Sequence, residues 1–393
     1  MYDYVIIGGG IAGLYTAYRL LSKTPVRIVI LEKENQIGGR AKTEVFYGVN
    51  IVSGAGIGRK RKDKLLLKLM HKLRIPVRFY TVKKDYVGFK SIDIMQIMNQ
   101  LKTEYKKNQV DKARLSFKKF AIQKIGVKKY NRFILTSGYR DYENENVWNT
   151  LYKYGMDDNT DNWKAFSVSW SLIENKLANY IGNRRIKLNH KVINISGSEE
   201  IGFEVKTNNN KIFKTKKVII ASTINTVQKL VKNKKLKFQP ILDNIKSQPF
   251  TRIYGKFSLE SAEIINRYLS FFTMVKSPLQ KIIPMDKEKG VYMICYNDNK
   301  NAEMLKSRMK NSLKNRIYLC KLFRDALGIK EKLELIAIRG YYWKEGTHYY
   351  EKKPISFREM SDDGITVVGE MISMNQGWVE GALESVEKVI ENL

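Results

Sequence analysis

Four glycines between positions 8 and 13 leave the start of this chain few ways to fold. The run Tyr4-Val5-Ile6-Ile7 has the composition of a buried strand and leads directly into Gly8-Gly9-Gly10-Ile11-Ala12-Gly13. From residue 14 to residue 21, leucine, alanine and tyrosine recur at helical spacing. A strand, a glycine turn and a helix in this order predict the first unit of a Rossmann-type dinucleotide-binding domain.

The glycines of this turn have separate physical roles in such a site. Gly8 permits the tight turn, Gly10 lets a pyrophosphate approach the backbone, and Gly13 lets the helix pack against the strand. The helix N-terminus adds N–H groups and the positive end of the helix dipole. We therefore expect a dinucleotide to contact Gly8, Gly10, Ala12 and Gly13.

A second predicted strand, residues 26–31, ends in an acidic residue. Glu32 follows Gly13 by 19 residues. A carboxylate at about 20 residues beyond the glycine turn accepts hydrogen bonds from the ribose diol of a dinucleotide. Glu32 is therefore expected to bind the cofactor, and its position makes the signal more specific than the glycines alone.

After Glu32 and five intervening residues, the chain reads Gly38-Gly39-Arg40. This motif resembles the FAD-binding family that contains amine oxidases, phytoene desaturases and protoporphyrinogen oxidases. The resemblance implies that FAD is the cofactor and that Gly39 and Arg40 lie at its phosphates. Two glycines allow a close backbone approach, and a guanidinium can bind a pyrophosphate through two hydrogen bonds.

The end of the chain carries a second part of the resemblance, to flavin amine oxidases. A predicted buried strand, residues 365–368, precedes Gly369-Glu370, and Trp378-Val379 stands before Glu-Gly-Ala at the start of a predicted helix. The resemblance implies that Glu370 bonds the ribityl chain and that the N–H of Val379 faces flavin O2. A helix N-terminus favours the negative charge that a reduced flavin carries there. Trp378 is expected to form an aromatic wall of the substrate channel.

Two softer correspondences add cofactor contacts. Gly56 and Ile57 resemble the turn that runs along the isoalloxazine edge, although the bulky aromatic residue that many relatives carry nearby is absent. Val192 resembles the strand residue whose backbone contacts adenine. Some relatives attach FAD to a cysteine in the segment that corresponds to 343–350, and this chain has none there, so noncovalent FAD is expected.

The resemblance also suggests catalytic residues. Flavin amine oxidases have a second aromatic ring at the flavin, and counting from Gly346 allows either His348 or Tyr349, of which Tyr349 has the favoured ring chemistry. The family also uses a lysine that holds a water near flavin N5. Lys256 lies one residue off the usual spacing and is the preferred candidate, with Arg252 as the alternative.

The resemblance is interrupted along the chain, which predicts an α/β fold with a Rossmann-type FAD-binding domain assembled from discontinuous segments. These segments are expected to be residues 1–76, 182–232 and 345–393. The substrate domain, residues 77–181 and 233–344, is expected to combine a mixed sheet with a helical layer. No Pro/Gly/Ser-rich linker separates the two domains.

Composition restricts the other classes of protein. The chain has 71 Lys and Arg against 39 Asp and Glu, a net charge of +32, which would attract an anionic partner such as nucleic acid or an acidic surface. No nucleic-acid motif accompanies this charge, and a solvated basic surface is the simpler interpretation.

Two isolated cysteines and three histidines provide no metal-ligand set, so no metal is expected. The absence of a signal-like or transmembrane segment predicts a cytoplasmic location.

These patterns lead to the hypothesis of an FAD-dependent oxidoreductase that oxidises an amine. Hydride transfer from carbon to flavin N5, hydrolysis of the imine and reoxidation by oxygen to hydrogen peroxide would complete the cycle. One alternative is a desaturase-like or mutase-like enzyme with a non-amine substrate, for example an anionic one. Another is a basic nucleic-acid or anionic-surface binding protein with structural FAD. Flavin reduction by amines, with peroxide release, separates the first hypothesis from both alternatives.

Overall fold

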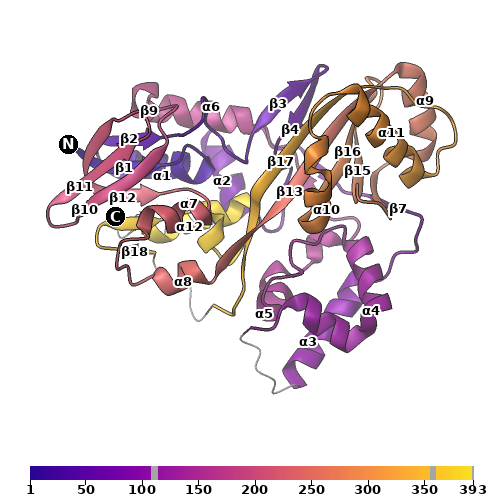
Figure 1. Ribbon diagram of the computed structural model, residues 1–393, viewed down its shortest axis with the longest axis horizontal. Coiled ribbons are helices and arrows are strands. Elements are labelled where there is room, and N and C mark those ends of the chain that lie inside the picture. The colour runs from indigo at the N-terminus through magenta and orange to yellow at the C-terminus, as the bar shows by residue number, and fades with distance from the viewer. Residues whose placement is uncertain (108–113, 355–359, 392–393) are drawn as a thin grey trace.

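A computed structural model of the chain describes residues 1–107, 114–354 and 360–391. Figure 1 shows two lobes, each built around a sheet, and a group of helices below their junction. The first lobe has an eight-stranded sheet, and six of its strands follow the order β10-β11-β12-β1-β2-β9. Its strands are β1 (Tyr2–Ile7), β2 (Ile28–Leu31), β9 (Ile186–Lys187), β10 (Val192–Ser198), β11 (Gly202–Thr207), β12 (Ile212–Ile220), β18 (Ser361–Asp362) and β19 (Ile365–Val367).

Strand β1 lies at the centre of the first sheet and is buried on both faces. It pairs in parallel with β2 and β12, and β19 in turn pairs in parallel with β12. Successive strand residues point to opposite faces, and accordingly Ile6 joins one hydrophobic core while Val5 and Ile7 join another. The helices around this sheet are α1 (Ile11–Lys23), α2 (Lys64–Lys72), α6 (Trp170–Ile181), α7 (Ile224–Val231), α8 (Gln239–Asp243) and α12 (Val379–Ile390).

The second lobe has a six-stranded sheet in the order β17-β13-β16-β15-β14-β7. Its pairs are antiparallel except for the parallel pair of β14 and β7. Two long strands, β13 and β17, extend from this sheet toward the first lobe (Figure 1). The elements are β7 (Lys84–Val87), β13 (Ile245–Phe257), α9 (Leu259–Tyr268), β14 (Phe272–Val275), β15 (Lys281–Asp286), β16 (Val291–Asp298), α10 (Asn299–Leu305), α11 (Leu313–Leu327) and β17 (Leu335–Tyr350).

The helical group below the junction has a core of its own. Apolar side chains of its three helices pack together, and Gly126 interrupts the longest helix with a φ of +76°. Its helices are α3 (Ile94–Lys107), α4 (Phe117–Ser137) and α5 (Val147–Asn149). Small sheets complete the fold: β3 (Thr43–Phe46) with β4 (Val49–Val52), and β5 (Gly58–Arg59) with β8 (Lys164–Phe166) and β6 (Phe79–Thr81).

The expected fold class is confirmed. The first sheet takes strands from the start, the middle and the end of the chain, so the Rossmann-type domain is discontinuous, and a second sheet and a helical group complete the fold. The predicted domain boundary between residues 344 and 345 falls inside β17, a continuous strand that serves both lobes.

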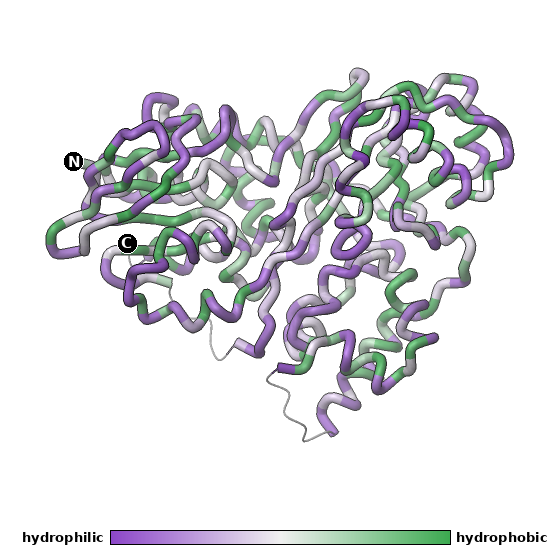
Figure 2. The backbone as a smooth tube through the Cα atoms, viewed as in Figure 1, coloured by the Kyte–Doolittle hydropathy of each residue, from purple (hydrophilic) through white to green (hydrophobic). Residues whose placement is uncertain are grey.

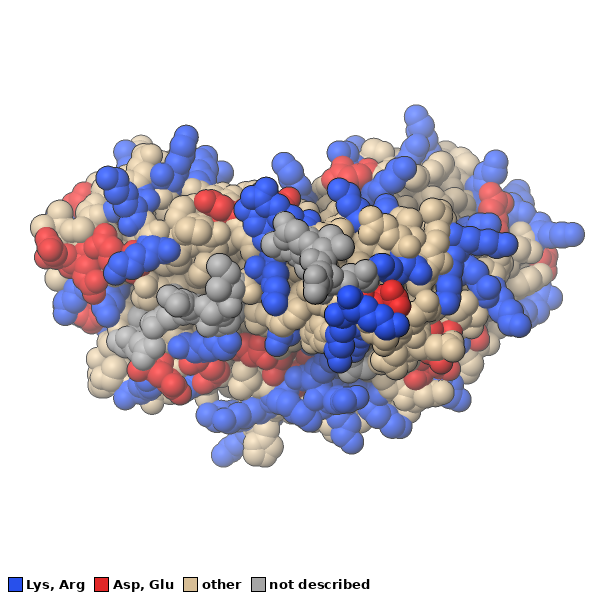
Figure 3. Space-filling view, turned by 90° about the horizontal axis from the view of Figure 1, so that it is seen from below, with Lys and Arg blue, Asp and Glu red and all other residues tan. Residues whose placement is uncertain are grey.

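The surface and the interior differ in the way expected of a folded chain. Figure 2 shows hydrophobic residues along the inner strands of both lobes and hydrophilic residues over many outer turns. Figure 3 shows Lys and Arg side chains over much of the lower face, with smaller groups of Asp and Glu among them. No helix within the described residues is long and apolar enough to span a membrane.

The packing of β1 generates a stability prediction. Ile6 is 0% exposed, and Ile6→Ala should lower the free energy of unfolding by about 2–5 kcal/mol, because it leaves a cavity in the first sheet. The matched variant Ile201→Ala, at a side chain that is 81% exposed, should change it by less than about 0.5 kcal/mol. Urea unfolding of both variants measures the difference, and equal effects would contradict this account of the core.

Candidate functional site

The glycine turn joins β1 to α1 in a conformation that excludes side chains at two positions. Gly8 has a φ of +113°, and a Cβ placed on it would lie 2.3 Å from the carbonyl oxygen of Ala221. A Cβ on Gly13 would lie 2.0 Å from the carbonyl oxygen of Gly8. Gly10 is the N-cap of α1, and no side chain caps this helix end. The first-turn N–H groups, including that of Ala12, are therefore suited to an anion.

Glu32 is fixed at the carboxyl end of β2, beside the turn. Its Oε2 accepts a hydrogen bond from the N–H of Gly9 at 2.6 Å, and its Oε1 accepts one from the N–H of Glu34 at 2.9 Å. The backbone carbonyl of Glu32 accepts from the N–H of His190 at 2.8 Å. This last bond brings the start of β10, where Val192 lies, to the same edge of the sheet.

The Gly-Gly-Arg segment packs directly on the glycine turn. The N–H of Gly38 donates to the carbonyl oxygen of Gly9 at 2.9 Å, and a Cβ on Gly39 would lie 3.6 Å from the Cα of Gly10. Arg40 follows, and its Nη1 donates to the carbonyl oxygen of Gly346 and to Glu370 Oε1, both at 2.8 Å. Arg40, Gly346 and Glu370, which are far apart in the sequence, thus lie together near the N-terminus of α1.

Glu370 accepts hydrogen bonds from three separate parts of the chain. Besides Arg40, its Oε1 is 2.5 Å from Nδ1 of His348, and its Oε2 accepts from the N–H of Gly377 at 2.9 Å. Burial by itself raises the pKa of Glu370, but the His348 ring and the Arg40 guanidinium outweigh it and hold that pKa at about 2. The carboxylate is therefore charged at neutral pH and orders the segment that leads to Trp378.

A cavity of about 640 Å³ lies next to the segments just described. Gly56, Ile57 and Trp378 line one side of it. The Gly56 segment is tied to the Gly-Gly-Arg segment, because the N–H of Ala55 donates to the carbonyl oxygen of Arg40 at 2.7 Å. The cavity and the predicted cofactor contacts therefore share a boundary.

Trp378 is the N-cap of α12, and Val379 is the first helical residue. The guanidinium of Arg59 lies 3.7 Å from the centre of the Trp378 ring. Arg59 is itself buried and pairs with Asp63 at 2.6 Å and with Asp158 at 3.3 Å. A cation over the indole face, held by two carboxylates, restricts the orientation of the Trp378 ring.

Tyr139, Arg252 and Tyr296 line the cavity on the side of the second lobe and the helical group. Arg252, from β13, lies with its guanidinium carbon 3.9 Å from the centre of the Tyr296 ring. Lys281 is fully buried behind these rings, with its Nζ 3.1 Å from the centre of Tyr139 and 3.7 Å from that of Tyr296. Burial lowers the pKa of Lys281 well below its ordinary value.

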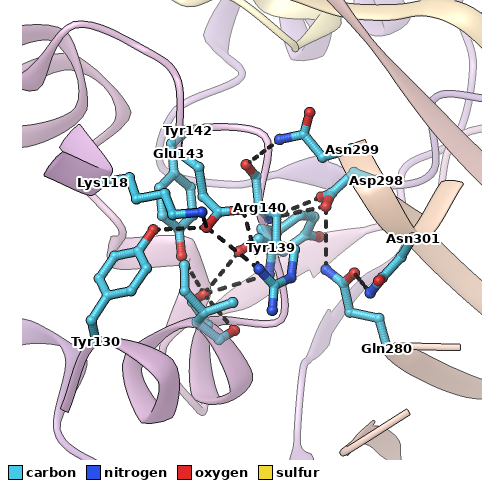
Figure 4. Close-up of polar contacts among 12 residues, drawn as sticks. Lys118, Tyr130, Tyr139, Arg140, Tyr142, Glu143, Gln280, Asp298, Asn299 and Asn301 are labelled. Carbon is cyan, nitrogen blue, oxygen red and sulfur yellow. Dashed lines mark hydrogen bonds and ion pairs between the residues drawn. The ribbon is translucent and has the colours of Figure 1, made fainter. Parts of the chain in front are cut away.

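Polar contacts anchor the segment that carries Tyr139, as Figure 4 shows. Both carboxylate oxygens of Asp298 accept from the N–H of Arg140, at 3.0 and 3.1 Å. The side-chain amide of Asn299 donates to the carbonyl oxygen of Arg140 at 2.7 Å, and the Arg140 guanidinium pairs with Glu143 at 3.2 Å. The end of β16 thus fixes the loop after α4, and with it one cavity wall.

Two predicted catalytic residues lie outside this arrangement. Lys256 is four residues beyond Arg252 on β13, about 13 Å along a strand, and its Nζ donates to the carbonyl oxygen of Lys289 at 2.6 Å. Tyr349 follows His348 on β17, so its side chain points away from the face on which His348 meets Glu370. Neither lines the cavity, and their catalytic roles stay predictions.

The structure adds residues that the sequence pattern did not single out. Arg59, Tyr139 and Tyr296 carry no motif, and long-range packing alone brings them to the cavity. Glu174, from α6, packs against Gly38, and burial raises the pKa of its carboxyl to about 8, so it is neutral at pH 7. His348, the alternative to Tyr349 in the count from Gly346, is the residue of this pair that contacts Glu370.

Comparisons with known proteins agree with this arrangement. Residues 6–73 match the model of the NAD(P)-binding Rossmann-like domain. The chain is 32% identical to flavin-containing amine oxidase A of Equus caballus over 89 residues, which are 23% of this chain and 17% of that protein. The match therefore spans about a sixth of that relative's length.

Solved structures of putrescine oxidase share the fold over their whole length. A triple mutant made for the redesign of cofactor binding superposes with a TM-score of 0.76 at 15% identity, covering 100% of this chain and 98% of that one. The wild type bound to putrescine gives 0.73 at 12% identity with the same coverage. The resemblance to amine oxidases that the motifs indicated is thus confirmed at the level of the fold.

The environment of Glu370 predicts a pH-dependent contribution to stability. A folded-state pKa of about 2 against an ordinary 4.5 stabilises the fold above pH 4.5, and this contribution disappears as the pH falls toward 2. Glu370→Gln should therefore cost about 3 kcal/mol at neutral pH and progressively less between pH 4.5 and 2.

Urea unfolding from pH 7 down to pH 3 measures this change, with Glu34→Gln as a control at a largely exposed glutamate. A Glu370→Gln deficit that stays constant over the whole range would show that its charge does not stabilise the fold.

Proposed function

We propose that this protein is an FAD-dependent oxidoreductase that oxidises an amine. One observation carries the proposal: the cavity lies against Gly56, Ile57 and Trp378, the residues expected at the flavin, and these are joined to the dinucleotide turn through Arg40. A substrate in this cavity would therefore face the redox-active part of the cofactor.

The residues of the first lobe fit FAD. Glu32 has a fixed carboxylate at the edge where a ribose diol would lie, and α1 presents an uncapped N-terminus for the pyrophosphate. Arg40 is 27% exposed, so its guanidinium can reach a phosphate while it remains paired with Glu370. Both cysteines, Cys295 and Cys320, are buried in the second lobe, which favours noncovalent binding.

The chemistry that FAD supplies when bound is removal of a hydride from a carbon beside nitrogen, followed by transfer of two electrons and two protons to oxygen to give hydrogen peroxide. Water then converts the imine to a carbonyl compound and ammonia or an amine. The protein has to orient the substrate carbon and limit the access of water. Trp378, held by Arg59, provides a rigid aromatic wall, and Met274 and Met293 add apolar lining.

A second candidate has the same cofactor but a non-amine, anionic substrate. It is favoured by the cations in the cavity wall, among them Arg252, Lys83 and Lys84. A desaturase-like or mutase-like enzyme would give no peroxide with amines, whereas an amine oxidase would.

An anaerobic screen of amines that follows flavin bleaching, then peroxide release in air, tests the proposal. Amine-dependent bleaching supports it, and bleaching by non-amine anions alone would replace it with the second candidate.

Glu32 provides a test of the cofactor site. Glu32→Ala removes a charged acceptor, and loss of a hydrogen bond to a charged group costs about 1.5–3 kcal/mol, so FAD affinity should fall at least about tenfold. Glu34→Ala is the matched control, because its exposed side chain lies two residues away. Titration of apoprotein with FAD, followed by flavin fluorescence, measures both affinities, and equal affinities would remove Glu32 from the site.

Trp378 provides a test of the substrate side. Trp378→Ala should leave FAD bound, since Val379 would contribute through its backbone, but a substrate carbon displaced by about 1 Å should be oxidised roughly a hundredfold more slowly. Trp148→Ala serves as the control, because Trp148 packs on Tyr152 in the helical group. Anaerobic stopped-flow reduction compares them, and wild-type rates in Trp378→Ala would show that this ring does not position the substrate.

A further inference from the structure

Arg252 is a buried cation without a matching anion in the described part of the chain. Its side chain belongs to a residue that is 4% exposed, and no carboxylate of the described residues lies within ion-pair distance of it. Its Nη1 donates to the sulfur of Met293 at 3.5 Å, and its buried Nε has no hydrogen-bond partner. The guanidinium nevertheless lines the cavity, where a ligand can reach it.

A guanidinium keeps its charge under all physiological conditions, so it cannot relieve its burial by losing a proton. Thioether sulfur is a weak acceptor, and the Tyr296 ring at 3.9 Å offers a cation–π contact but no hydrogen bond. Buried charges in proteins are normally paired, and an unpaired one requires an explanation. An anionic group in the cavity would supply the missing acceptors.

The surrounding charges within the described residues do not supply the missing acceptor. Lys281 is fully buried behind the Tyr296 ring, and the carboxylates of Asp298 and Asp141 act on that lysine. Asp158 contributes a carboxylate to the lining, but it is paired with Arg59 at 3.3 Å and Lys62 at 3.4 Å. The acid of the lining is thus neutralised, whereas the cation at Arg252 is not.

The position of Arg252 within the cavity defines where the anion would bind. A Cβ placed on Gly56 would lie 3.1 Å from Nη2 of Arg252, so the guanidinium reaches the turn expected along the isoalloxazine edge. An anion at Arg252 would therefore lie close to the carbon that is oxidised. A second ammonium group, as in a diamine, would be repelled there.

We propose that Arg252 binds a carboxylate of the substrate, so that the oxidised amine is an amino acid, with its carboxylate a few bonds from the reacting carbon. The inference rests on the proposed amine oxidation and names the class of substrate. Planar carboxylate and guanidinium groups pair through two parallel hydrogen bonds, which matches the free donors of Arg252 to a carboxylate.

The first test compares each amino acid with its decarboxylated amine on the FAD-loaded protein. Suitable pairs are phenylalanine and phenethylamine, lysine and cadaverine, and ornithine and putrescine, in both enantiomers of the acids. Anaerobic flavin reduction should be about 10- to 100-fold more efficient for the acid of at least one pair. Faster reduction by the amine in every pair would overturn the inference and leave the proposed amine oxidation in place.

The second test measures carboxylate binding without turnover. Benzoate should bind the FAD-loaded protein and perturb the flavin absorbance, and Arg252→Met should raise its dissociation constant at least about tenfold. Arg252→Lys should give an intermediate value, because it retains the charge but loses the planar pair of donors. Arg267→Met, at an exposed arginine on α9, is the control. Flavin content and thermal unfolding confirm that each variant is folded.

Two outcomes separate this inference from other roles of Arg252. An equal loss of reduction by the acid and the amine in Arg252→Met, with a changed flavin potential and unchanged benzoate binding, would assign Arg252 to the cofactor and overturn the inference. If no amine or amino acid reduces the flavin, the proposed function fails. The dependence of benzoate binding on Arg252 would still decide whether this residue forms a carboxylate site.

Discussion

The ion pair between Arg40 and Glu370 holds together parts of the chain that are more than 300 residues apart. Arg40 follows the segment that packs on the glycine turn, whereas Glu370 receives further hydrogen bonds from His348 and Gly377. Burying a carboxylate is costly unless it is paired and hydrogen-bonded, and here each oxygen of Glu370 has a donor. The start of the chain, β17 and the entry to α12 therefore depend on one charged group for their relative placement.

The cavity has two different sides, and both are positioned by contacts that involve this arrangement. On one side, Gly56 and Trp378 are positioned by contacts that lead back to Arg40 and Glu370. On the other side, Arg252 is carried by β13, a long strand that pairs with β17. Because β17 also brings His348 to Glu370, the same strand couples the two sides of the cavity. A change in the pairing of these two strands would alter both.

Charge has different consequences in the two lobes. In the first lobe the buried carboxylates of Glu32 and Glu370 are satisfied by donors, which gives rigid contacts before any ligand binds. At the cavity, the buried guanidinium of Arg252 has no such partner at its Nε among the described residues. In the proposed function, the cofactor site is preformed, and the substrate would supply the charge that matches Arg252. The surface charge of +32 gives no such positional information.

The glycine turn, the acid at Glu32 and the Gly-Glu pair at Glu370 could be predicted from the sequence, because each is a local backbone requirement with a fixed spacing. The choice between Arg252 and Lys256 as the candidate residue at the cavity could not be predicted from the sequence. Both lie on β13, and the depth of each along the strand depends on pairing that shifts register at irregularities. Local pattern determined the residues proposed to hold the cofactor, whereas the tertiary structure decided which residues line the cavity, since only strand register and long-range packing bring them together.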